Sequence, residues 1–156
     1  MKPHFDRMFR YVAWANQRVL IALKNCPAAQ AEGTPLLAHL LAAEQVWFSR
    51  LQGREPALPV WPTLSLPECQ ALAAQCEAGW AGYMTQLREE KMQAWVEYRN
   101  SRGEAFVNSV EEILTHVITH GPYHRGQIAK VLGRTGGEAV NTDFIMFVRL
   151  TTANAG

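Results

Sequence analysis

The spacing of apolar residues along the first third of the chain predicts two amphipathic helices. Between Phe5 and Leu23, apolar side chains recur mostly at steps of three and four residues, which is typical of a helix with one buried face. A second pattern of this kind runs to about Leu51. Thr34 is suited to cap that helix and Pro35 to occupy its first position. We therefore expect a Pro- and Gly-rich loop between the two helices.

The middle of the chain predicts a long connection and a third helix. Four prolines lie in the stretch 53–67, so an extended segment that crosses the bundle is expected there. An Ala-, Leu- and Gln-rich stretch follows, and it predicts a helix from Ser65 or Leu66 to about Lys91.

The remaining pattern predicts a hairpin and two more helices. The segments 93–98 and 104–107 flank turn residues and indicate a small β-hairpin. Ser109 is a suitable N-cap for a fourth long helix that ends near Leu132, and 143–150 predicts a short closing helix. We expect an all-α fold in which a four-helix bundle has one long crossover connection.

Composition narrows the class of protein. A chain of 156 residues with 48% hydrophobic and 19% charged residues is expected to fold as a single domain over 1–156. The formal net charge of +1 disfavours nucleic acid as a partner, because no excess of positive charge is present to bind phosphates. No apolar run approaches the roughly 20 residues that cross a bilayer, and no signal peptide is recognisable at the N-terminus. Three cysteines without a CxxC pair fit a reducing compartment, so a cytoplasmic protein is expected.

Histidines are the candidate chemistry. His116, His120 and His124 follow one another at intervals of four in the fourth predicted helix, and His39 lies in the second. Residues i and i+4 of a helix are one turn apart and within about 40° of each other, so two imidazoles can share one cation. Spacing alone allows either the 116–120 or the 120–124 pair. Without an ion, the three would form a polar stripe, and His39 alone is more typical of a hydrogen-bonded core residue.

Several segments resemble one protein family. LAHLLAAEQVW at Leu37–Trp47 and YHRGQI at Tyr123–Ile128 are similar to the DinB-like proteins, also grouped with the YfiT-like metalloenzymes. The similarity extends to YVAWANQRVL at 11–20 and TDFI at 142–145. It implies a four-helix bundle that is frequently a homodimer and holds a divalent metal ion. The family's name refers to induction by DNA damage and implies no DNA-binding activity.

The resemblance also implies a ligand set. Position by position, the three ligands are His39, His120 and His124. His116 is then left as a candidate hydrogen-bonding partner of a ligand or substrate, and as a candidate general base. Tyr123 is a candidate either to bring its hydroxyl near the metal or to pack between helices. Pro122 departs from the family pattern, and we expect a kink or a wide turn between the two ligands of the fourth helix.

Other conspicuous residues have weaker predictions. Trp47 is the tryptophan that we favour as lining a substrate pocket, because it lies two turns from His39. Glu44 should point about 140° away from His39 and is a poor fourth ligand. Arg125 and Gln127 are interpreted as structural.

The expected function is that of a metal-dependent enzyme. A three-histidine site with open coordination positions can activate a thiol or a water molecule, and relatives of the family include thiol-dependent S-transferases and metal-dependent hydrolases. We therefore expect a small-molecule substrate, a zinc, nickel or iron ion, and a low-molecular-weight thiol as a possible cosubstrate. The alternatives are a non-enzymatic metal-binding or stress-associated bundle, and a metal-free helical interaction module.

Overall fold

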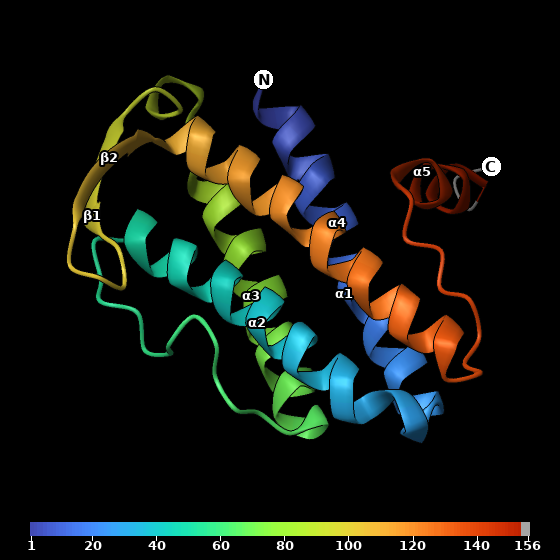
Figure 1. Cartoon of the computed structure of the whole chain (residues 1–156). Coiled ribbons are helices and arrows are strands. Elements are labelled where there is room, and N and C mark those ends of the chain that lie inside the picture. Colours follow the sequence, from blue (N-terminus) through green and yellow to red (C-terminus); the bar gives the residue numbers. More distant parts are fainter. Residues whose placement is uncertain (154–156) are drawn as a thin grey trace.

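Four long helices pack lengthwise against one another in the computed structural model, which describes residues 1–153 (Figure 1). They are α1 (Lys2–Asn25), α2 (Pro27–Leu51), α3 (Leu66–Gln86) and α4 (Val110–Arg134). A short helix, α5 (Phe144–Ala153), follows them and lies beside the bundle, nearest to α1. The expected helical bundle is confirmed. In the part of the chain that the structure describes, none of the helices combines the length and apolar character needed to cross a membrane.

Helix α2 packs against all three other long helices, most extensively against α4. Its residues from Leu37 to Glu44 are buried without a break. Each large aliphatic side chain enclosed in this core contributes about 1.5–3 kcal/mol to folding. The core therefore fixes the position of α2 and of any functional side chain on it.

The predicted start of the second helix is wrong. Helix α2 begins at Pro27, directly after α1, and Pro35 lies inside it on the exposed side. Gly33 faces α1 so closely that a Cβ there would collide with Leu23. The Pro and Gly residues suggested a loop because each weakens a helix. In this case Pro27 occupies a first helical turn, which favours proline, and the absence of a Cβ at Gly33 leaves room for the Leu23 side chain of α1.

The third helix and the hairpin are found with shifted ends. Ser65 caps α3, and its side chain and that of Glu68 form a reciprocal capping box. The helix ends at Gln86 rather than near Lys91, and a 3₁₀ turn follows it. Strands β1 (Trp95–Arg99) and β2 (Ala105–Ser109) pair antiparallel, with Trp95 opposite Ser109. The hairpin lies at one end of the bundle (Figure 1).

Helix α4 begins as predicted and runs further than predicted. Ser109 caps it through a second capping box with Glu112, and it continues to Arg134. Pro122 lies within this helix without interrupting it, so the expected wide turn is not observed between Val110 and Arg134. The proline side chain faces solvent, where its missing backbone donor costs one intrahelical hydrogen bond.

Candidate metal centre

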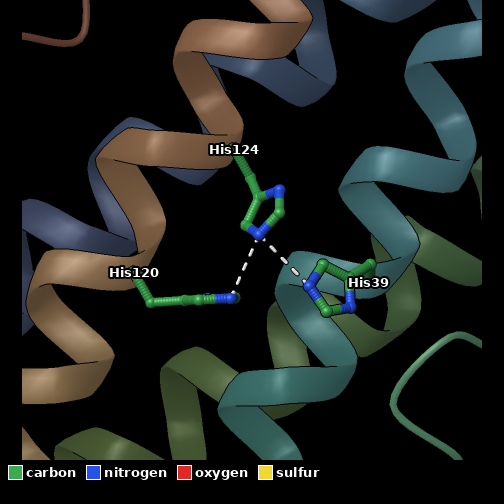
Figure 2. A group of neighbouring side chains, drawn as sticks. All are labelled: His39, His120 and His124. Carbon is green, nitrogen blue, oxygen red and sulfur yellow. Dashed lines mark hydrogen bonds between the residues drawn. The ribbon is translucent and has the colours of Figure 1, made fainter.

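Three histidines converge between two neighbouring helices (Figure 2). His39 projects from α2, and His120 and His124 project from consecutive turns of α4. The Nε2 atom of His124 lies 3.2 Å from Nε2 of His39 and 3.1 Å from Nε2 of His120. One ring nitrogen of each histidine lies within 4.8 Å of the other two. His39 and His124 are buried, and His120 is partly exposed.

The other ring nitrogens of two histidines are fixed by hydrogen bonds. Nδ1 of His39 lies 2.8 Å from the carbonyl oxygen of Val60, and Nδ1 of His124 lies 2.7 Å from the side-chain oxygen of Gln127. A carbonyl oxygen can only accept, so both Nδ1 atoms carry the proton and donate. In a neutral ring, Nε2 is then the unprotonated atom that can bind a metal. Both rings therefore present a lone pair to the centre of the group.

Two facing lone pairs need a cation or a proton between them. When all three rings are neutral, the one proton available to these contacts is on Nε2 of His120, which can donate it to His124. No proton is then left for the contact between the Nε2 atoms of His39 and His124. Two nitrogens each about 2.05 Å from a zinc ion, at a tetrahedral angle, are about 3.3 Å apart. The observed separations of 3.1 and 3.2 Å fit this arrangement.

The surroundings of His39 and His120 favour the uncharged ring. Burial lowers the pKa of His120 to about 4, and repulsion from His124, His39 and His116 acts in the same direction. Burial also lowers the pKa of His39, against the opposing effect of its hydrogen bond to Val60. Neutral imidazole is the form that binds a metal ion. The three-histidine group is therefore compatible with metal binding.

Comparisons with known proteins identify the family of the chain. The model of the DinB family matches residues 1–155, which is nearly the whole chain. The chain belongs to the DinB family. A curated relative, Protein DinB of Bacillus subtilis (strain 168), is 24% identical over 169 residues, a match that covers 93% of this chain and 94% of the relative. No solved structure matches the chain at the same level of significance.

The connection between α2 and α3 supplies an aromatic residue that sequence reasoning did not single out in this DinB-family chain. The Trp61 ring stacks on His39, with 3.6 Å between the ring centroids and 5° between the planes. The preceding residue, Val60, is the partner of His39 Nδ1. The connection therefore fastens the His39 ring from two sides. Only the proline content of the segment indicated an ordered path, and nothing in its spacing identified the tryptophan.

Trp47, the tryptophan favoured from the sequence, has a different position. Its ring contacts His116, with 5.0 Å between the centroids, and Tyr98 of the hairpin. The Arg50 guanidinium lies 4.4 Å from the Trp47 ring centroid. Trp47 thus lies beside His116, outside the three converging histidines, and Trp61 is the tryptophan stacked on His39.

The two other candidate residues border the group. His116 is exposed, and its ring centroid lies 5.5 Å from that of His120. Within residues 1–153, its imidazole makes no hydrogen bond to the three converging histidines, and a hydrogen bond to a substrate stays a prediction. Tyr123 is 67% exposed, and its ring meets the edge of His124 at 5.0 Å between centroids. It does not pack between helices.

Glu44 and Arg125 belong to the core beside the site. Glu44 is separate from the histidine group, as predicted, and accepts a 2.8 Å hydrogen bond from Asn16 of α1. Arg125 follows His124 in the chain but points the other way. It donates to Asn16 Oδ1 at 2.9 Å and to the Tyr11 hydroxyl at 3.3 Å. These contacts agree with the structural interpretation of Arg125, and they tie α4 to α1 directly behind a converging histidine.

Proposed function

We propose that this protein binds one divalent metal ion through His39, His120 and His124 and acts as a metal-dependent enzyme of the thiol S-transferase or hydrolase type. The observation that carries the proposal is the pair of facing Nε2 lone pairs on His39 and His124, 3.2 Å apart. Buried acceptors that face each other are unfavourable unless a cation or a proton lies between them. Membership in the DinB family supports the same assignment.

The chemistry requires neutral ligands and free coordination positions. A divalent ion held by three neutral imidazoles keeps its charge and lowers the pKa of a thiol or water bound beside it. Val60 and Gln127 hold two of the rings in the orientation and tautomer that binding needs. Trp61 forms an apolar wall over His39. We expect the small-molecule substrate to approach past the partly exposed His120.

His116 is the candidate general base of this proposal. Partial desolvation by its neighbours and the nearby Arg50 guanidinium lower the pKa of His116 although the residue is exposed, so its imidazole is neutral near pH 7 and able to accept a proton. Its ring centroid lies 5.5 Å from that of His120, close enough for one bridging water or thiol to lie between the base and the metal. The role of Tyr123 stays a prediction, as do the expected homodimer, the thiol cosubstrate and the choice among zinc, nickel and iron.

A non-enzymatic metal-binding protein is the competing function. If the ion only stabilises the bundle, its removal should unfold the protein; if the ion is catalytic, the metal-free bundle should persist. The large apolar core that surrounds α2 favours the second outcome, because it does not depend on the three histidines.

The experiment is an activity screen on protein reconstituted with zinc, nickel or iron. Low-molecular-weight thiols are paired with an electrophile, and ester and amide substrates are tested in parallel. The proposal expects turnover that disappears in His39→Ala and falls at least tenfold in His116→Ala. Turnover that is equal in wild type and His39→Ala would contradict it, and a folded, metal-loaded protein inactive on both substrate classes would favour the non-enzymatic alternative.

A further inference from the structure

A cavity lies between α1 and α3, and its lining shares no residue with the three-histidine group. It has a volume of about 720 Å³, within the range of small-molecule sites. Apolar side chains form most of its wall, among them Phe9, Val12, Trp80 and Met84. The Phe9 and Trp80 rings stack there, with 4.5 Å between their centroids. Cavities of this size and apolar character are typical of ligand sites.

One buried acid reaches this cavity from behind. Glu44 is the single lining residue that α2 contributes in the described part of the chain, since the others come from α1 and α3. Its side chain is deeply buried, because only 4% of the residue is exposed. One carboxylate oxygen accepts from Asn16 at 2.8 Å. Within residues 1–153, the other oxygen has no hydrogen-bond partner, so half of this carboxylate remains available at the floor of the cavity.

The charges around Glu44 leave its carboxylate only partly compensated. The guanidinium of Arg125 on α4 acts electrostatically on Glu44, but it donates to Asn16 and Tyr11 and forms no ion pair with Glu44. Cys76 of α3 also faces the carboxylate, and its thiol donates to the Leu41 carbonyl oxygen. Burial raises the pKa of Glu44 to about 7, against the opposing effects of Asn16 and Arg125. A buried charge without an ion partner costs free energy that a bound cation would recover.

We propose that this cavity binds a small organic cation with an apolar body, whose ammonium group pairs with the free carboxylate oxygen of Glu44. The apolar body would lie against Phe9, Trp80 and Met84, where aromatic faces also favour a cation. The other charged side chains of the lining balance one another. Asp6 and Glu77 are matched by Lys2 and Arg10, and Lys2 is paired with Asp6 at 3.1 Å, so the choice of a cation rests on Glu44.

The experiment measures binding by calorimetry at pH 8, where Glu44 is mostly ionised. The probe is 2-phenylethylammonium, and the neutral comparison is 2-phenylethanol, which has the same ring and a similar length. The cation should bind at least tenfold more tightly than the alcohol, because a hydrogen bond to a charged group is stronger than one between neutral groups. Equal affinities, or no binding of the cation, would overturn the proposal.

Four variants locate the probe. Glu44→Gln keeps the shape and the acceptor for Asn16 but removes the charge, and it should weaken binding of the cation at least tenfold. Glu77→Gln, an exposed acid of the same cavity, should change it less than threefold. Ala81→Trp, on the exposed side of α3, should block the cavity and abolish binding even if Glu44→Gln fails to fold. His39→Ala should bind the probe as wild type does.

Two results would assign the probe elsewhere. If His39→Ala loses the probe and Ala81→Trp retains it, the amine binds at the histidine group and the cavity proposal is wrong. If Glu77→Gln weakens binding as much as Glu44→Gln, the cation is held by surface charge alone and the proposal is equally wrong. Neither result depends on whether the proposed metal-dependent activity exists, so the two proposals fail separately.

Discussion

Glu44 makes the stability of the protein depend on pH in a way that one substitution can isolate. Its pKa is raised from 4.5 to about 7 in the folded state, chiefly by burial. At a pH between these two values, an acid of this kind binds more protons in the folded than in the unfolded state. Stability therefore falls as pH rises through that range. The protonated Glu44 is compatible with the core, whereas the ionised form is destabilised by its burial.

The magnitude follows from the two pKa values. A difference of one in pKa between the folded and unfolded states corresponds to about 1.36 kcal/mol, so the full penalty above pH 7 is about 3 kcal/mol. Between pH 5 and pH 8, the penalty grows by about 2.5 kcal/mol. Glu44→Gln cannot ionise. Its free energy of unfolding should therefore rise relative to wild type by about that amount across this range, whatever the absolute difference at pH 5.

The assay is urea denaturation followed by circular dichroism at pH 5, 6, 7 and 8, with a chelator present so that metal binding does not contribute. Histidine titration is common to both proteins and cancels in the difference. Glu77→Gln is the control, and because solvent hydrates Glu77 in both states, its difference from wild type should stay flat. A difference between Glu44→Gln and wild type that stays within about 0.5 kcal/mol over the range would refute the reasoning, because Glu44 would then be hydrated or fully paired in the fold.

Three further predictions concern the histidine site and its support. A Cβ at Gly121 would lie 2.5 Å from Arg125 Nη1, so Gly121→Ala should lower the free energy of unfolding by about 1–2 kcal/mol in thermal or urea denaturation. Gly126→Ala, on the open side of the same helix, should raise it by up to about 1 kcal/mol. Equal effects of the two substitutions would exclude the contact. Gln127→Ala removes the acceptor of His124 Nδ1 and should weaken zinc binding in a competition titration about 10–100-fold, so an unchanged affinity would show that the ring is oriented without it. Removing metal with a chelator should leave the far-ultraviolet circular dichroism spectrum within a few per cent of the original, and a collapse of helicity would instead indicate a structural ion.

Local sequence signals were sufficient for much of the fold. Apolar periodicity located the first two long helices and composition located the third. Ser65 and Ser109 marked two helix starts, because each side chain accepts from the backbone N–H three residues further on. The i, i+4 spacing also limited the ligand pair to two possibilities on one helix face. The choice between them came from the family resemblance, and the structure brings together His39, His120 and His124.

Tertiary contacts account for what could not be predicted. The start of α2 was missed because Pro27 and Gly33 weaken an isolated helix, and only the packing of α2 on α1 favours it. The stack of Trp61 on His39 joins the connection after α2 to the middle of that helix, and no sequence periodicity relates a loop residue to a helix residue. The contacts of Arg125 with Asn16 link α4 to α1 across the core in the same way.

The most direct test of the three-histidine site is metal content. Wild type, His39→Ala, His124→Ala and His116→Ala are purified without a nickel column and measured by elemental analysis, with circular dichroism to show that each is folded. We predict about one metal ion per chain in wild type and in His116→Ala, and loss of the ion from the two other folded variants. A wild-type protein that is metal-free and takes up no zinc, nickel or iron on titration, or a metal ion that survives both His39→Ala and His124→Ala, would contradict this assignment.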